Sequence, residues 1–209
     1  MSYSTMTVAD LLDAFASNEP VPGGGSASAL AGAVGVSLLV MVAGLPKTRT
    51  GAPEEAADLA EAASRLRPLR DTLASLIDQD SDAYSAVLAA LRLPKETDAD
   101  TAARRDAMET AMRGATEVPM DVMRACQQAL RGAVIVAGNG NRNAATDTGV
   151  AIELLLAGVR GAAMNVDVNV RSLSDASFVT RVSTERAQLE TDGAADAAHA
   201  RSLLERAGT

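Results

Sequence analysis

The sequence predicts an all-α fold, a single-domain helical bundle of about six to eight helices. Apolar residues make up 47% of the 209-residue chain, which is enough to bury a substantial core. Aromatic residues contribute only 2% while alanine is abundant, and this composition favours helices packed through small side chains over a β-sheet. No linker or fixed-period repeat divides the chain, so we expect one domain over residues 1–209.

Proline and glycine clusters mark the ends of the expected helices. The breaks fall at Pro20 to Gly25, at Pro46 to Pro53, at Pro94 and at Gly138 to Asn141. Between them, apolar residues recur with a helical period. We expect helices over residues 5–17, 27–44, 54–92, 98–114, 117–138, 146–169 and 175–206. Pro68 and Pro119 fall within these spans, where proline kinks or restarts a helix.

The charged and reactive residues argue against several classes of function. A net charge of −8 without a basic cluster argues against nucleic-acid binding. The single cysteine, Cys126, cannot form an internal disulfide and is expected to be buried, and the first twenty residues do not resemble a secretory signal. We therefore expect a cytoplasmic protein. The only histidine, His199, lies in the charged tail, which argues against a histidine-based triad and against a metal site.

The helix expected over residues 27–44 lies in a stretch without charged residues, from Ala27 to Leu45. This stretch is long enough to be compared with a membrane span. Glycines and serines dilute its hydrophobicity, so we expect a buried helix and no membrane contact. Ala31 and Gly35, four residues apart, let another helix approach closely. This pattern indicates either a tight bundle or a seam between two copies of the chain.

The loop before that helix contains Gly23, Gly24 and Gly25 in succession. Glycines can adopt positive φ and present bare N–H groups, and Ser26 or Ser28 can cap the helix that follows. We therefore expect a helix start that holds an anion or a polar heterocycle. The glycine spacing matches neither a Walker loop nor a dinucleotide fingerprint, so nucleotide binding is not implied.

Three acids, Asp78, Asp80 and Asp82, fall within the helix expected over residues 54–92. At about 100° per residue, Asp78 and Asp82 share one face, whereas Asp80 lies almost opposite, in register with the apolar stripe. A carboxylate on an apolar stripe is costly unless it is paired or protonated. Asp80 is therefore a candidate for a raised pKa and for general acid/base chemistry. The alternative is that an arginine on a neighbouring helix neutralises it.

The two lysines of the chain, Lys47 and Lys95, both follow a Leu-Pro pair. They are either cations that suit the end of a helix dipole or point charges reserved for an anionic ligand.

Asparagines cluster at both ends of the helix expected over residues 146–169. Asn139, Asn141 and Asn143 precede it, and three amides in five residues are more than a polar turn requires. Near its end, Asn165 and Asn169 share one helical face, although this segment also alternates like a strand. Two amides on one helical face can recognise the donor and acceptor edges of a heterocycle.

Five motifs, taken in order, make the chain similar to the cyclodeaminase/cyclohydrolase family. This family comprises the C-terminal domain of formiminotransferase-cyclodeaminase and stand-alone methenyltetrahydrofolate cyclohydrolases. The motifs are Pro20-Val-Pro-Gly-Gly-Gly-Ser26, Asp78-Gln-Asp80 followed by Ala83-Tyr84, Leu93-Pro-Lys95, Gly140-Asn141 followed by Asp147, and Asn165-Val-Asp-Val-Asn169. Each motif is weak alone, but five in order are specific.

The resemblance implies an all-helical homodimer that binds a tetrahydrofolate derivative near the subunit interface, with no metal or redox cofactor. It implies substrate-binding roles for Gly23, Gly24, Gly25, Ser26, Tyr84, Lys95, Asn141, Asp147, Asn165 and Asn169. The proton donor of the cyclodeaminase branch matches Asp78, whereas cyclohydrolase-type relatives keep the acid that matches Asp80. Periodicity favours Asp80 and the resemblance favours Asp78, so both are catalytic candidates.

The resemblance also implies one of two reactions. In the cyclodeaminase reaction, N10 of 5-formimidoyltetrahydrofolate attacks the amidine carbon and ammonia departs, which gives 5,10-methenyltetrahydrofolate. In the cyclohydrolase reaction, water adds to the methenyl carbon and ring opening gives 10-formyltetrahydrofolate. Both reactions need a positioned acid/base and an oriented pterin. The alternative from another class is a non-catalytic folate-binding or scaffold homodimer.

Overall fold

The computed structural model describes residues 2–205, which form six α-helices, three short 3-10 helices and no strand. The α-helices are α1 (Val8–Ala16), α2 (Gly24–Ala43), α3 (Pro53–Leu91), α4 (Asp98–Asn139), α5 (Ala145–Asn169) and α6 (Ala176–Glu205). The 3-10 helices are η1 (Tyr3–Thr5), η2 (Arg142–Ala144) and η3 (Val170–Ser172). The predicted all-α bundle is confirmed, and the predicted last residue of the final helix, Arg206, lies outside the described residues.

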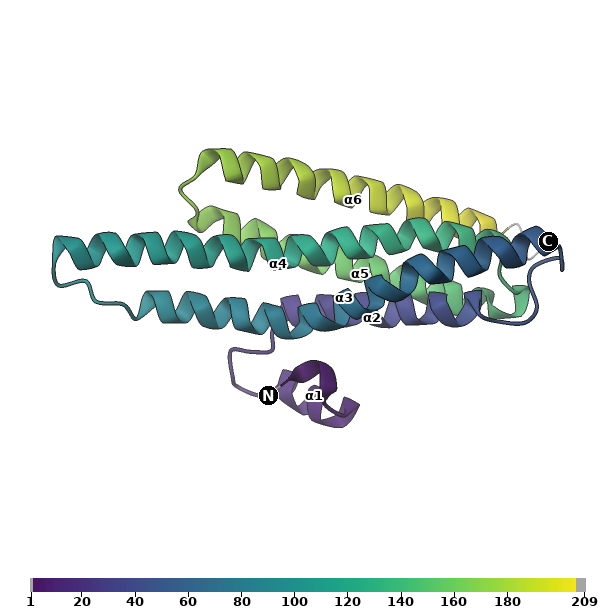
Figure 1. Cartoon of the computed structure of the whole chain (residues 1–209), viewed down its shortest axis with the longest axis horizontal. Helices are drawn as coiled ribbons and strands as arrows, with labels where there is room; N and C mark the ends of the chain where they lie inside the picture. Colours follow the sequence, from purple (N-terminus) through teal and green to yellow (C-terminus); the bar gives the residue numbers. More distant parts are fainter. Residues whose placement is uncertain (1, 206–209) are drawn as a thin grey trace.

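The long helices α3 and α4 form a hairpin, and α6 packs along α4 and α5 (Figure 1). Helices α2 and α5 pack against each other in antiparallel orientation, since Gly24 lies beside Asn165 whereas Gly35 lies beside Leu155. Small residues allow this close approach: a Cβ on Gly158 would come within 3.1 Å of the carbonyl oxygen of Ser28. Helix α1 lies apart from the bundle (Figure 1), whereas η1 before it contacts α3.

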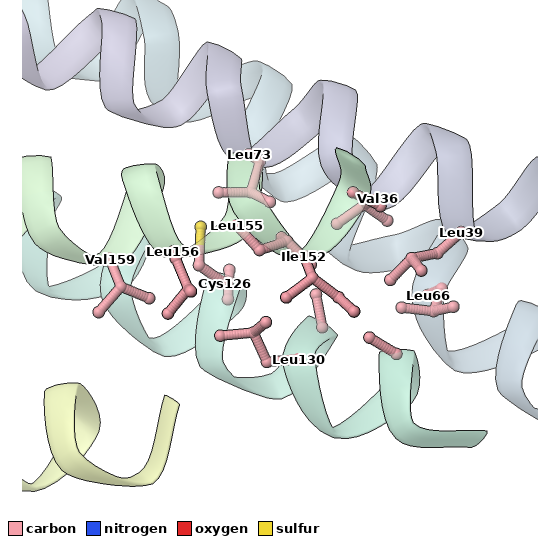
Figure 2. Close-up of a cluster of buried hydrophobic side chains, with 14 of the residues drawn as sticks. Val36, Leu39, Leu66, Leu73, Cys126, Leu130, Ile152, Leu155, Leu156 and Val159 are labelled. Carbon is pink, nitrogen blue, oxygen red and sulfur yellow. The ribbon is translucent and has the colours of Figure 1, made fainter. Parts of the chain in front are cut away.

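The core lies where α2, α3, α4 and α5 meet. Figure 2 shows Val36 and Leu39 of α2, Leu66 and Leu73 of α3, Cys126 and Leu130 of α4, and Ile152, Leu155, Leu156 and Val159 of α5 in one buried cluster. A Cβ on Gly32 or Gly158 would lie only 2.6 or 2.7 Å from the Sγ of Cys126, so the thiol fills the space between two glycines. The predicted burial of Cys126 is confirmed, and burial raises the pKa of its thiol to about 12.

Helix α4 is continuous from Asp98 to Asn139, so the predicted break between residues 114 and 117 is wrong. Pro119 lies inside this helix and lacks the N–H that would bond to the carbonyl of Ala115. The side-chain amide of Asn169 supplies the missing donor, with 2.7 Å between its Nδ2 and the carbonyl oxygen of Ala115. A donor from α5 therefore satisfies the acceptor that the proline leaves free.

Helix α2 and the segment Arg142–Ser172 around α5 are each long and apolar enough to cross a membrane, by length and composition alone. Half of each apolar window is buried in the bundle, so the expectation of a buried helix holds for one face of α2 only. The other faces carry apolar residues at heptad-like spacing on both helices. We call this surface the α2–α5 face; it comprises Ala27, Ala31, Val34, Leu38 and Met41 of α2 and Val150, Leu154, Ala157, Met164 and Val168 of α5.

Candidate functional site

The carboxylate of Asp80 on α3 binds the N-terminus of α2. Its Oδ2 accepts hydrogen bonds from the backbone N–H of Ser26, at 2.8 Å, and from the Ser26 hydroxyl, at 3.0 Å. Helix α2 begins at Gly24 with Gly23 as its N-cap, and the cap residue makes no side-chain hydrogen bond. The first N–H groups of a helix have no partner within it, so Asp80 supplies an acceptor from a neighbouring helix.

Gly25 allows this contact. A Cβ on Gly25 would lie 2.0 Å from the Oδ1 of Asp80, and the nearest contact of a Cβ on Gly24 would be the Nδ2 of Asn165 at 3.8 Å. None of the three glycines uses positive φ, which in residues 2–205 occurs only at Gly51. The glycines lie within the first turn of α2, where a missing side chain permits close approach.

The two oxygens of Asp80 have different surroundings. Oδ2 is held by Ser26, whereas Oδ1 accepts no hydrogen bond from residues 2–205. Burial raises the pKa of Asp80 above the ordinary 3.8, against the opposing effect of the Ser26 hydrogen bonds. The expectation that an arginine neutralises Asp80 is not met within the described residues, where its partner is Ser26. The carboxyl is therefore held through Oδ2, whereas Oδ1 lies against Gly25 without a hydrogen-bond partner among residues 2–205.

Ser81 extends this arrangement and was missed by the sequence reasoning. Its buried hydroxyl lies 3.3 Å from the Ser26 hydroxyl, which also lies 2.9 Å from the carbonyl oxygen of Ile77. The sequence feature that could have indicated Ser81 is its place in the helical period, which predicts a buried side chain where a serine stands.

Asp78 lies in a different environment. Its carboxylate accepts hydrogen bonds from three groups of the N-terminal segment: the hydroxyls of Ser2 and Ser4, at 2.8 and 2.6 Å, and the backbone N–H of Tyr3, at 2.5 Å. Burial acts to raise the pKa of Asp78, but these hydrogen bonds outweigh it, so the net direction is downward. The two candidate acids thus have pKa values shifted in opposite directions, and Asp80 is the one that holds a proton more tightly than an ordinary aspartate.

The two late asparagines lie on α5, so the strand alternative for residues 165–169 is wrong. Asn165 lies beside Gly24, and its side-chain amide donates to the carbonyl of Gly161 in its own helix, at 2.9 Å. The side-chain amide nitrogen of Asn169 donates to the carbonyl oxygen of Ala115. Asn165 therefore lies at the start of α2, beside the glycine that precedes the contact of Gly25 with Asp80, whereas the observed contact of Asn169 is structural.

Replacing Asn169 with alanine is expected to lower the free energy of unfolding by about 1 to 3 kcal/mol, because the half-buried carbonyl of Ala115 loses its donor. Urea unfolding measures this effect. Asn165→Ala is the matched control, since it removes an amide that bonds only within its own helix. Equal stability losses in the two variants would contradict the assigned role of Asn169.

Four further residues that the sequence predicts for the site either lie far from Asp80 or are more exposed to solvent than Asp80. Tyr84 stands one turn beyond Asp80 and is 41% exposed. Lys95 lies past the end of α3, which is about 16 Å from Asp80 along the helix axis. Asn141 caps η2 by accepting from the N–H of Asn143, and Asp147 lies in the first turn of α5, about 27 Å along that helix from Asn165. One copy of the chain therefore does not bring all predicted residues together.

A pocket of about 690 Å³ lies between the first half of α3 and the second half of α4. Its lining residues are Asp58, Glu61, Ala62, Arg65, Leu66, Pro68, Leu69, Gln128, Arg131, Gly132 and Ile135. None of the predicted site residues is among them. The Asp80 site lies instead at the start of α2, where Gly24 and Ala27, the first exposed residues of that helix, adjoin the α2–α5 face. Within residues 2–205, no group of three or more His, Cys, Asp or Glu side chains is placed to hold a metal ion.

Comparison with known proteins identifies the family. The family model for formiminotransferase-cyclodeaminase matches residues 7–188. The chain belongs to this family. It is 41% identical over 172 residues to a methenyltetrahydrofolate cyclohydrolase of Methylorubrum extorquens, a match that covers 82% of this chain and 83% of the relative. The resemblance found in the sequence motifs is thereby confirmed.

The bifunctional relatives are longer than this chain. It is 29% identical over 185 residues to the formimidoyltransferase-cyclodeaminase of Gallus gallus, and the match covers 88% of this chain but 34% of that protein. Among solved structures, a formiminotetrahydrofolate cyclodeaminase from Thermotoga maritima matches with a TM-score of 0.85 over 96% of both chains, at 24% identity. This chain and the Thermotoga maritima protein therefore share the same fold.

Proposed function

We propose that this protein is a methenyltetrahydrofolate cyclohydrolase. As a member of its family, it is an enzyme that acts on a C–N bond of a substituted tetrahydrofolate. The observation that carries the assignment is the position of Asp80, which is held through Oδ2 at a glycine-lined helix start while its Oδ1 has no hydrogen-bond partner among residues 2–205. The hydrolase is favoured because the 41% identical relative matches over most of both chains, whereas the bifunctional deaminases are less similar and share about a third of their length.

The reaction needs a group that first accepts and then donates a proton. The Oδ1 of ionised Asp80 takes a proton from a water molecule while the water oxygen bonds to the methenyl carbon. Asp80 then returns that proton to N5 as the bond between the carbon and N5 breaks. The hydroxyl on the carbon loses its own proton to solvent, and the product is 10-formyltetrahydrofolate. The raised pKa makes the Asp80 carboxylate a stronger base than an ordinary aspartate, which favours the first step and keeps the proton on the carboxyl until N5 accepts it.

Cyclodeamination is the second candidate, and the same group fits it. N10 attacks the formimidoyl carbon, Asp80 accepts the proton from N10, and the departing nitrogen receives it before it leaves as ammonia. The related deaminases give this alternative specific support. Neither reaction is an oxidation or a reduction, so we propose that the substrate is bound without a redox cofactor.

Separate presentation of the two substrates tests the assignment. With 5,10-methenyltetrahydrofolate, the protein is expected to accelerate loss of the methenyl chromophore above the rate of spontaneous hydrolysis. With 5-formimidoyltetrahydrofolate, ammonia release at the higher catalytic efficiency would identify a deaminase instead. Tight folate binding without turnover of either substrate would leave the scaffold alternative and contradict the proposal.

We further propose that the enzyme is a homodimer joined through the α2–α5 face. An apolar surface that covers the outer side of two adjacent helices is costly to leave in water, and its heptad-like spacing suits packing against helices. A two-fold axis that lies in this interface and crosses the helices places the partner's Asn141 and Asp147 beside the first chain's Gly24 and Asp80. The residues that one copy separates would then form one site.

The cellular location and the class of partner can be proposed from the cysteine content and the net charge. We propose a cytoplasmic location, which the single buried Cys126 suits, and no nucleic-acid partner, given the net charge of −8. The α2–α5 face is assigned to a second copy and not to a membrane.

A further inference from the structure

The N-terminal segment is attached to one turn of α3 at both of its ends. At its start, Ser2, Tyr3 and Ser4 donate three hydrogen bonds to Asp78. At its end, Ser26 donates two hydrogen bonds to Asp80. Residues 2–26 therefore form a closed loop whose two anchors are carboxylates only two positions apart on the same helix.

Between the anchors, the segment has few other attachments. Helix α1 buries only Leu11, whereas Val8 and Leu12 are 75% and 60% exposed. The position of α1 beside the bundle, and the direction in which residues 17–23 enter α2, therefore depend on how the ends are held (Figure 1). A segment with so little buried apolar surface opens at low free-energy cost once an anchor is removed.

We propose that Asp78 is a positioning residue that pins the N-terminal segment, and through it the Gly23 to Gly25 helix start, and that it is not the proton donor. The kinetic part of this inference rests on the proposed function, whereas the pinning itself does not. All the observed donors to Asp78 come from the segment it holds. A carboxylate with three donors is also stabilised in its charged form, which opposes use as an acid.

The chemistry of the side chain allows the two roles to be separated. A proton donor is lost in both Asp78→Ala and Asp78→Asn, because an amide cannot supply the proton. A hydrogen-bonding anchor is lost in Asp78→Ala but largely kept in Asp78→Asn, whose oxygen accepts from the N–H of Tyr3 and whose amide can donate to a serine hydroxyl oxygen. The double variant Ser2→Ala/Ser4→Ala removes two of the three anchor bonds without touching Asp78.

The first measurement is hydrogen exchange of residues 3–26 in the folate-free protein. Asp78→Ala and Ser2→Ala/Ser4→Ala are expected to exchange at least about tenfold faster in this segment than wild type, with the rest of the bundle unchanged. Asp78→Asn is expected to remain close to wild type. Asp82→Asn, an exposed acid one turn along the same helix, is the control. Unchanged exchange in Asp78→Ala would overturn the pinning, whether or not the protein is an enzyme.

The second measurement is the division of the kinetic effect between KM and kcat. Loss of the anchor is expected to raise KM in Asp78→Ala and in the double serine variant, with kcat within about threefold of wild type. Asp78→Asn is expected to restore KM toward the wild-type value. A fall in kcat of about 100-fold or more in both Asp78 variants, with a normal double serine variant, would overturn the proposal and assign the proton to Asp78.

Discussion

Asp80→Asn is expected to lower kcat by about 10²- to 10⁴-fold while KM changes little. The amide keeps the size of the carboxyl and can still accept from Ser26 through its oxygen, so the helix start stays in place. What it loses is the ability to take a proton from water and return it to N5. Steady-state assays of wild type, Asp80→Asn and the exposed control Asp82→Asn measure the effect. Full activity in Asp80→Asn would remove Asp80 from the chemistry.

The raised pKa of Asp80 adds a pH dependence. Asp80 must be ionised to accept the first proton, so kcat/KM is expected to fall on the acid side with an apparent pKa above 3.8. The folded state holds the Asp80 proton more tightly than the unfolded state. The stability contribution of this group is therefore present below 3.8 and is lost as pH rises through the folded pKa. Asp80→Asn should remove this trend, which denaturation at several pH values measures.

Mixing two inactive variants is expected to restore activity. If each site combines Asp80 of one copy with Asp147 of the other, Asp80→Asn and Asp147→Asn are both inactive as homodimers. In a mixed dimer, one site carries both substitutions and the other carries neither. Random exchange of subunits makes half of the dimers mixed, so the equimolar mixture should reach about a quarter of wild-type activity.

Two controls show whether the subunits exchange and whether the α2–α5 face joins them. The mixture must be unfolded and refolded together, because separately folded homodimers need not exchange subunits. Val34→Glu places a charge on the α2–α5 face and is expected to shift the protein toward monomer in light scattering. A dimer whose mixed variants stay inactive would indicate a two-fold axis along the helices, which keeps the two ends apart.

The sequence contained enough to predict the fold class and most helix ends. Proline and glycine clusters placed both ends of α3 and the start of α5 within one residue. Two errors have a common physical origin. We expected Gly24 and Gly25 in a loop, but they lie in the first turn of α2, where Asp80 of α3 accepts from the backbone N–H of Ser26. We expected Pro119 near the start of a new helix, but it lies inside α4, where Asn169 of α5 donates to the carbonyl that the proline leaves without a donor. Local propensity does not contain such contacts.

The candidate site was predictable only in part for the same reason. The helical period placed Asp80 on the buried side of α3, and the structure finds it half-buried against Ser26. Nothing local indicated that its partner would be a serine and not an arginine. The three groups that hold Asp78 lie 74 to 76 residues away in sequence, so its role depends on tertiary structure.

The role of Asp80 can be tested by a crystal structure of the protein with bound 5-formyltetrahydrofolate, a stable folate that carries a one-carbon group on N5. We expect the one-carbon group to lie at the start of α2, within about 2.6 to 3.2 Å of the Oδ1 of Asp80 or one water away. We also expect Asn141 and Asp147 of a second copy to lie on the other side of the pterin. A folate bound in the pocket between α3 and α4, away from Asp80, would contradict the proposed role of Asp80.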